Sequence, residues 1–273
     1  IPESASEQAR FGGVTVRACG HCLFLDAGAS RARLDLSAGR CDAALDPALF
    51  SRPGNLEDDP VTLVVLALTL LLRHRGRFGL HAAALAEGEV GCLLVADGHC
   101  GKSTLSFHLL AEGWGYVTDD FALLRPSDHA VEAHGLRRNL CMSREASARL
   151  PALRGQWRDR PFAGASKRWL EMDVLFPGQV QEFCVPRILL FPQIVDAELS
   201  ELEPLLDKAE IFSRLMQQSK LLVVEPSMTR RHLEVLKRLL LQSRSFRLRA
   251  GRDLLQRPGR AAEILAGVGD TPG

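Results

Sequence analysis

The residues from Ala96 to Ser103 have the types and spacing of a phosphate-binding loop. They read Ala-Asp-Gly-His-Cys-Gly-Lys-Ser and match the pattern G-x-x-x-x-G-K-[S/T] except at the first position, where alanine replaces glycine. In such a loop, backbone N–H groups and the positive end of the following helix hold phosphate oxygens. Lys102 is then expected to reach the β- and γ-phosphates of ATP, and Ser103 to bind Mg²⁺. The residues expected to contact the nucleotide are Asp97, Gly98, His99, Cys100, Gly101, Lys102, Ser103 and Thr104.

Two adjacent carboxylates, Asp119 and Asp120, end a predicted strand that follows this loop. Neighbouring side chains on a strand point to opposite faces, so the two groups should have different tasks. In phosphoryl transfer one carboxylate can orient or deprotonate the acceptor hydroxyl, while the other serves the metal or a supporting group. The alternative is an Asp-Asp pair that only forms a turn at the end of the strand.

The elements that must position these groups follow one another between residues 80 and 124. Apolar runs predict strands at Leu80–Ala86 and Val90–Val95, and a further strand at Trp114–Leu124. Leucines on one face predict a helix at Ser103–Glu112, which Gly113 ends. Strand, loop, helix and strand form a βαβ unit, which predicts neighbouring parallel strands and an α/β domain.

The rest of the chain divides into a small β-rich region at residues 1–60 and a catalytic domain at residues 61–273. Alternating apolar residues between positions 11 and 36 predict short strands, and a turn-rich stretch runs from Asp46 to Pro60. The amino-terminal region could recognise the acceptor or form a contact between copies of the chain, and both remain open. The later elements expected are a strand at Ile188–Phe191 and helices at Val61–Leu72, Lys208–Gln218, Arg230–Ser243 and Arg260–Ala266.

Composition excludes several other classes of function. A formal net charge of +1 gives no general attraction to nucleic acid or an anionic membrane. The most apolar run, Val61–Leu72, is shorter than the roughly 20 residues that cross a bilayer. Seven scattered cysteines, an odd number, fit reduced thiols in the cytoplasm. Cys19-Gly20-His21-Cys22 has the sequence of a redox motif, but it lies in a predicted strand rather than at a helix start.

The stretch from Gly79 to Leu124 resembles the catalytic core of the HPr kinase/phosphorylase superfamily. Its order is the same: a histidine (His81), a phosphate loop with aspartate in second place, a helix, a Gly-aromatic turn and an Asp-Asp strand. The resemblance implies an α/β P-loop kinase core of the HPr kinase/PEP carboxykinase-like type. It further implies that Asp119 is the base toward an acceptor serine and that His81 supports it. Lys102 would bind phosphate, Ser103 would bind Mg²⁺, and Asp120 is the second expected metal ligand.

Two later segments, one around Lys167 and Arg168 and one at residues 246–255, are similar to smaller relatives of HPr kinase, including peptide-modifying kinases of biosynthetic clusters. The chain departs from the family pattern at His99, where glycine is usual. It also has no match to the segment carrying the second metal-binding glutamate and the carboxyl-terminal catalytic arginine. HPr itself is therefore not the expected substrate. Lys167 or Arg168 could supply the missing positive charge or simply be solvated.

Together these features predict an ATP- and Mg²⁺-dependent kinase that phosphorylates a hydroxyl, with a serine of a peptide or small protein as the expected acceptor. Two alternatives remain open. One is a kinase for a small metabolite, and the other is a non-catalytic ATP-binding scaffold that recruits a peptide.

Overall fold

The computed structural model describes residues 1–47, 60–98, 100–136, 139–148, 150, 155, 157–159, 167–257 and 259–269. His99 and most of the predicted turn-rich stretch lie outside the described residues. The chain forms two compact units, each assembled from three stretches of sequence. Unit 1 contains Ile1–Phe78, Ser143–Arg168 and Leu221–His232, and unit 2 contains Gly79–Met142, Trp169–Lys220 and Leu233–Gly273. The units contain other residues than the two predicted regions, 1–60 and 61–273. One reason is that the helix beginning at residue 60 packs on the amino-terminal sheet.

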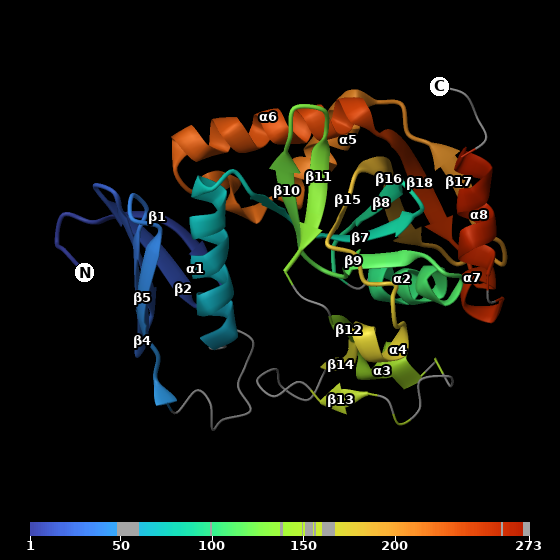
Figure 1. Cartoon of the computed structure of the whole chain (residues 1–273), viewed down its shortest axis with the longest axis horizontal. Helices are drawn as coiled ribbons and strands as arrows, with labels where there is room; N and C mark the ends of the chain where they lie inside the picture. The colour runs from blue at the N-terminus through green and yellow to red at the C-terminus, as the bar shows by residue number, and fades with distance from the viewer. Residues whose placement is uncertain are drawn as a thin grey trace. The chain divides into compact units, whose positions relative to one another are not determined.

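Unit 1 contains a five-stranded antiparallel meander in which each strand pairs with the next along the chain (Figure 1). Its strands are β1 (Ser6–Phe11), β2 (Val14–Cys19), β3 (Cys22–Ala27), β4 (Ser30–Asp35) and β5 (Arg40–Ala44). Helix α1 (Pro60–His74) packs on one face of this sheet. Alternate strand residues and one stripe of the helix form the core, among them Val14, Val16, Leu23, Leu25, Leu34, Leu63 and Leu70. The predicted strands and the predicted apolar helix are therefore confirmed.

The Cys19–Cys22 motif forms the turn of the β2–β3 hairpin. Cys19 and Cys22 are opposite each other in the register, and Gly20 has a φ of 58° in the left-handed region. Glycine is suited to that position because it lacks the Cβ that makes positive φ unfavourable. The motif thus lies at a hairpin tip, without the helix start that lowers the pKa of a redox-active thiol.

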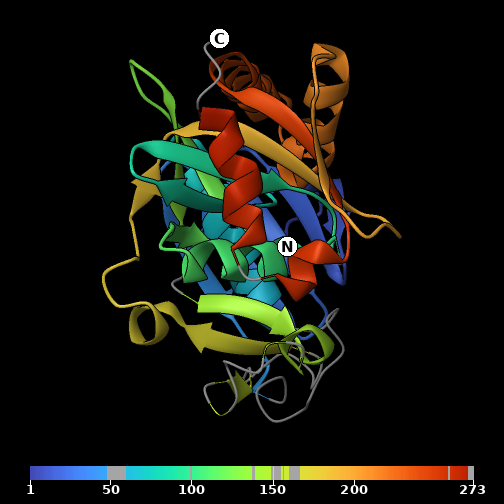
Figure 2. The same ribbon diagram turned by 90° about the vertical axis from the view of Figure 1, so that its right-hand side faces the viewer.

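Unit 2 is built on a six-stranded mixed sheet with the strand order β17-β18-β16-β8-β7-β9. The bounds are β7 (Ala82–Glu87), β8 (Val90–Val95), β9 (Gly115–Thr118), β16 (Pro186–Ile194), β17 (Glu201–Pro204) and β18 (Arg244–Ala250). Strands β8, β16 and β18 run parallel, whereas β7, next to β8, is antiparallel to it. Figures 1 and 2 show α2 (Lys102–Ala111) beside α8 (Arg260–Gly269).

The prediction of neighbouring parallel strands around α2 is wrong in one respect. Strands β8 and β9 have the same direction, but β7 lies between them and pairs antiparallel with both. The β7–β8 hairpin provides this arrangement, because a tight turn always returns the chain antiparallel to the strand before it. The parallel neighbour of β8 is instead β16, far along the chain.

Two strands that were predicted as continuous are interrupted at His81 and at the Asp119–Asp120 pair. The predicted strand Leu80–Ala86 is divided at His81 into β6 (Phe78–Leu80) and β7, and these belong to different sheets. The predicted strand Trp114–Leu124 is divided between β9 and β10 (Ala122–Pro126) in the same way. At His81 the chain enters the six-stranded sheet from a four-stranded sheet with the order β15-β11-β10-β6, and after β9 it returns to that four-stranded sheet. A hydrophobicity pattern does not reveal this change, because both sheets bury their strands.

The remaining elements complete the described part of the chain. The other strands are β11 (Val131–Gly135), β12 (Asn139–Ser143), β13 (Arg158–Asp159), β14 (Lys167–Glu171) and β15 (Phe183–Cys184). The other helices are α3 (Arg144–Ala148), α4 (Met172–Leu175), α5 (Lys208–Gln217), a 3₁₀ turn (Lys220–Val223), α6 (Pro226–Gln242) and α7 (Asp253–Gln256). Helices α2, α5, α6 and α8 confirm four of the helices predicted from the sequence. Helix α6 begins four residues before its predicted start at Arg230. None of the described helices is both long and apolar enough to cross a membrane.

Candidate active site

The predicted phosphate loop lies between a strand and a helix, as the motif expects. It connects the end of β8 at Val95 to the start of α2 at Lys102. Gly101 caps the helix with a φ of 83°, so glycine is needed there. Among the described residues, Glu225 is the one non-glycine residue with a positive φ, so Ala96 has an ordinary backbone conformation. The replacement of glycine by Ala96 is therefore compatible with the loop.

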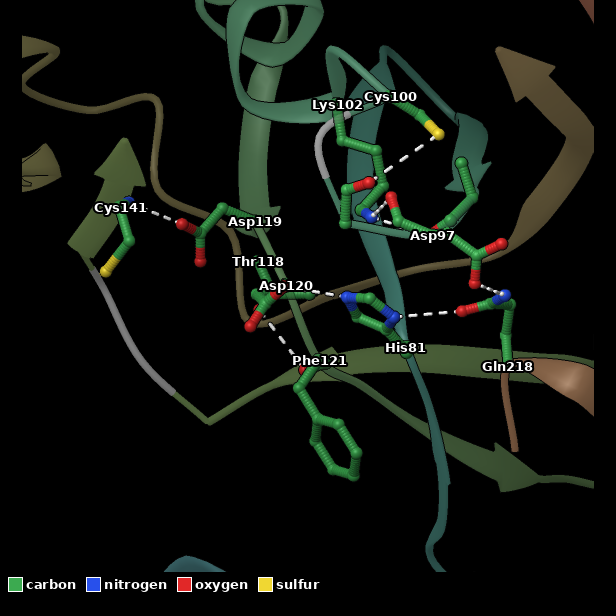
Figure 3. A network of polar contacts seen from close by, with 12 residues as sticks. His81, Asp97, Cys100, Lys102, Thr118, Asp119, Asp120, Phe121, Cys141 and Gln218 are labelled. Atoms are coloured by element: carbon green, nitrogen blue, oxygen red, sulfur yellow. Dashed lines mark hydrogen bonds and ion pairs between the residues drawn. The ribbon is translucent and has the colours of Figure 1, made fainter. Parts of the chain in front are cut away.

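Lys102 lies over the loop that precedes it. Its side chain is largely buried, with the residue 7% exposed, and its ammonium group donates hydrogen bonds to two loop carbonyls. The Nζ–O distances are 2.5 Å to Ala96 and 2.8 Å to Asp97 (Figure 3). The first turn of α2 also directs N–H groups toward the loop, because the first four N–H groups of a helix have no partner within it. Positive charge and N–H donors therefore gather at one place, which suits a phosphate group.

The Asp119–Asp120 pair occupies a short turn between β9 and β10. The turn is closed by Thr118, whose hydroxyl donates to the carbonyl oxygen of Phe121 at 3.2 Å. The ring of Phe121 covers Gly79, where a Cβ atom would come within 2.2 Å of the ring. A side chain at position 79, on the strand β6 that precedes His81, would therefore have to displace this ring.

Asp119 faces the protein interior and is only 4% exposed. Its Oδ2 accepts a hydrogen bond of 2.5 Å from the backbone N–H of Cys141, and Oδ1 lies 3.4 Å from the hydroxyl of Tyr116. The same hydroxyl donates to the carbonyl oxygen of Asn139 at 2.8 Å. Burial, together with the charge of Asp119, raises the pKa of the Tyr116 hydroxyl, which therefore stays protonated and able to donate.

Asp120 is exposed where Asp119 is buried, although the two residues lie in a turn and not on the strand that was predicted. Its side chain is 62% exposed, and its Oδ1 lies 2.9 Å from Nε2 of His81. The expectation that His81 supports Asp119 therefore needs correction, since the hydrogen bond of its Nε2 is made to Asp120 (Figure 3). The break between β6 and β7 places His81 at this point.

A residue that the sequence did not single out connects these groups to the loop. Gln218 follows the last turn of α5 and is 7% exposed. Its side chain lies 2.9 Å from Nδ1 of His81 and donates to Oδ1 of Asp97 at 2.7 Å. Its position at the end of a predicted helix carried no functional signal, because the residues it contacts are distant in the sequence.

The other predicted site residues lie partly in the loop and helix α2 and partly in unit 1. Ser103 lies in the first turn of α2 and is half-buried, and Thr104 follows it on the same helix. The sulfur of Cys100 lies 3.8 Å from the carbonyl oxygen of Gly98. Arg168 belongs to unit 1, so the structure does not place it relative to the loop in unit 2.

The donors present fit Mg²⁺, which prefers oxygen ligands and takes one or two carboxylates plus substrate phosphates. The Ser103 hydroxyl and the Asp120 carboxylate are ligands of that type. Within the described ranges, no three or more His, Cys, Asp or Glu side chains gather into a metal-binding cluster.

Comparisons with known proteins add little to this description. No protein-family model matches the chain, and no curated protein matches it. Among solved structures, the chain is similar to the Hpr(Ser) kinase/phosphatase from Coxiella burnetii, with 21% sequence identity and a TM-score of 0.30. The match covers 47% of this chain and 64% of that chain, which is less than two thirds of its length. A likeness of this extent does not establish a family.

Proposed function

We propose that this protein is an ATP-dependent phosphotransferase that phosphorylates a hydroxyl group. The observation that carries the proposal is the hydrogen-bonded connection between a phosphate loop and a carboxylate pair in unit 2. Phosphoryl transfer needs a group that holds the phosphates and a carboxylate that orients the acceptor. Lys102 and the loop could hold the phosphates, and Asp119, the neighbour of the connected Asp120, could orient the acceptor.

The phosphate end is supported by Lys102 and by the first turn of α2. The ammonium group lies against the carbonyls of Ala96 and Asp97, which places its charge over the loop backbone. On nucleotide binding, Lys102 would exchange these neutral oxygens for phosphate oxygens, which are stronger acceptors because they are charged. Mg²⁺, bound by Ser103 and Asp120, would neutralise charge that develops on the phosphates.

The acceptor end is supported by the different surroundings of the two carboxylates. Asp119 is held by the Cys141 N–H and the Tyr116 hydroxyl, so its orientation is set before an acceptor arrives. We propose that it orients or deprotonates the acceptor hydroxyl, and that the exposed Asp120 serves the metal with His81 behind it. The proposed acceptor is a serine of a peptide or small protein, which rests on the sequence resemblance alone.

The test is intact-mass analysis of candidate acceptor peptides, encoded beside the gene of this protein, after incubation with ATP and Mg²⁺. Wild-type protein should add one phosphoryl mass to an acceptor, and Lys102→Ala should not, because it removes the charge that holds the phosphates. Lys237→Ala is the matched control, since Lys237 is exposed on α6. If wild type binds ATP but modifies neither peptides nor small hydroxyl metabolites, the phosphotransferase proposal fails and a binding scaffold is favoured.

A further inference from the structure

We propose that Gln218 is a positioning residue that connects the phosphate loop to His81 and thereby sets the orientation of the His81 ring against Asp120. Its part in catalysis rests on the proposed phosphotransferase function. Its part in the structure rests on three contacts. These are the side-chain contacts with His81 Nδ1 and Asp97 Oδ1, and a hydrogen bond of 2.9 Å from the backbone N–H of His81 to the carbonyl oxygen of Gln218.

The directions of these hydrogen bonds follow from the chemistry of the groups. An ionised carboxylate can only accept, so the amide nitrogen of Gln218 must face Asp97. The amide oxygen then faces Nδ1 of His81, which must carry a proton in order to donate to it. Gln218 therefore favours a proton on Nδ1 and leaves Nε2 directed at Asp120. Because that carboxylate also can only accept, the hydrogen bond to Asp120 needs a proton on Nε2 as well.

Glutamine is suited to this position because it combines a donor and an acceptor on one rigid amide group. A glutamate at position 218 could accept from His81 but would place a second carboxylate against Asp97. An apolar residue of similar size could make neither contact. Gln218 is almost fully buried, so leaving its amide nitrogen or oxygen without a partner would lower the free energy of unfolding.

The helix that carries Gln218 is itself well held. Asp207 caps α5 by accepting from the backbone N–H groups of Ala209 and Glu210. The guanidinium of Arg214, one turn before Gln218, lies 5.5 Å from the ring centre of Phe191 in β16. A capped helix anchored to the central sheet can hold a side chain in a defined place, as a positioning role requires.

Gln218 also connects the phosphate loop with the histidine and carboxylate end of the proposed site. Asp97 is bound twice, since its carbonyl oxygen accepts from Lys102 and its carboxylate accepts from Gln218. A shift of the loop at Asp97 would therefore reach the His81 ring through one side chain. Asp120 lies at the other side of that ring.

The first experiment records the ring nitrogen signals of His81 by ¹H–¹⁵N correlation spectroscopy, assigned with His81→Asn, in wild type, Gln218→Leu and Gln218→Glu. Wild type and Gln218→Glu should show a protonated Nδ1, because both offer an oxygen to it. Gln218→Leu should lose that defined state. Gln217→Leu is the matched control, because the neighbouring Gln217 is exposed, and it should resemble wild type.

The second experiment measures the Kd for ATP·Mg²⁺ and the rate of phosphoryl transfer in the same variants. Gln218→Leu and Gln218→Glu should both bind ATP·Mg²⁺ about tenfold more weakly, because Asp97 loses its donor. Gln218→Leu should also lower kcat, whereas Gln217→Leu should change neither value. Circular dichroism and the Tm identify any variant that fails to fold. If Gln218→Leu does not fold, the ATP·Mg²⁺ affinity of Gln218→Glu still tests the contact with Asp97.

The results separate this inference from the proposed function. The His81 signals and the ATP affinity need no acceptor, so they decide the role of Gln218 even if wild type transfers no phosphoryl group. A Gln218→Leu protein that keeps the protonated Nδ1 would overturn the inference. So would one that loses it while binding ATP·Mg²⁺ as wild type does, since the connection to the loop would then be absent.

Discussion

Asp119 and Asp120 are neighbours in the chain, yet they differ in burial and in hydrogen-bond partners. One is buried, accepts a hydrogen bond from a backbone N–H and lies beside a tyrosine hydroxyl, while the other is exposed and pairs with a histidine. Donors directed at a carboxylate hold it in one orientation, so Asp119 should be well positioned. Exposure lets Asp120 meet a metal ion or a solvated group.

Replacing Asp119 with Asn tests the proposed division of tasks. The side chain keeps its size but cannot take a proton from the acceptor, so we expect transfer to fall by about 10²- to 10⁴-fold. The Kd for ATP·Mg²⁺ should stay near the wild-type value, because Asp119 is not placed among the phosphate-binding groups. Rates come from intact-mass time courses, and affinities from titration calorimetry.

Asp120→Asn is the matched control for that prediction. It should raise the Mg²⁺ concentration needed for half-maximal transfer, because it removes a proposed metal ligand. If Asp119→Asn transfers normally and Asp120→Asn does not, the two roles must be exchanged.

At the scale of the element, the site depends on places where strands stop. The β6–β7 break carries His81 and the β9–β10 break carries the aspartates, and at each the chain passes from one sheet to the other. Close packing between these sheets leaves no room at certain glycines. A Cβ atom at Gly135 on β11 would come within 2.0 Å of the carbonyl oxygen of Val117 on β9.

Gly135→Ala should therefore destabilise unit 2. A backbone oxygen cannot move aside as a flexible side chain can, so we expect the free energy of unfolding to fall by about 1–3 kcal/mol. Urea denaturation followed by circular dichroism measures the change.

Gly267→Ala makes the same chemical change in open space. Gly267 is exposed on α8 with nothing within 4 Å of an added Cβ, so alanine should raise the free energy of unfolding by about 0.5–1 kcal/mol. Equal losses in both variants would show that the clash at Gly135 is not the cause.

At the scale of the whole molecule, the chain passes more than once between its two compact units, and each unit has a buried core. Unit 1 also contains a buried histidine, His232, whereas the candidate active site lies in unit 2. His232 is fully buried beside Phe78, and neither of its ring nitrogens has a hydrogen-bond partner among the described residues. Burial, with a smaller contribution from the charge of Arg73, lowers its pKa to about 3.

This histidine predicts how stability depends on pH. The unfolded chain binds a proton at His232 below its usual pKa of about 6.5, whereas the folded protein resists that proton down to a pH of about 3. The stabilising contribution is therefore present at pH 7 and is lost as the pH falls through this window, at up to about 1.4 kcal/mol for each unit of pH. Urea unfolding between pH 7 and pH 5 measures that slope.

His232→Phe should flatten the slope, since it replaces the titrating group with a ring that cannot bind a proton. His21→Phe, at an exposed turn position of the same unit, should keep the wild-type slope. An unchanged slope in His232→Phe would assign the acid sensitivity to other groups.

The sequence by itself determined the parts of this protein that depend on local chemistry. The strand at Val90–Val95, the loop after it and the helix that begins at Lys102 follow from apolar runs, glycines and a lysine at set spacings. So do the amino-terminal strands and α1, because alternation and helical periodicity record which face is buried. Different surroundings for the two aspartates were also predicted, but from strand alternation, whereas the structure places both residues in the turn after β9.

Only the tertiary structure decided which distant residues meet these local parts. The insertion of β7 between β8 and β9, the pairing of His81 with Asp120 and the place of Gln218 leave no periodic trace in the sequence. Gln218 contacts residues 137 and 121 positions earlier in the chain, His81 and Asp97. Such contacts depend on how sheets and helices pack, and packing is a property of the folded chain rather than of any one segment of it.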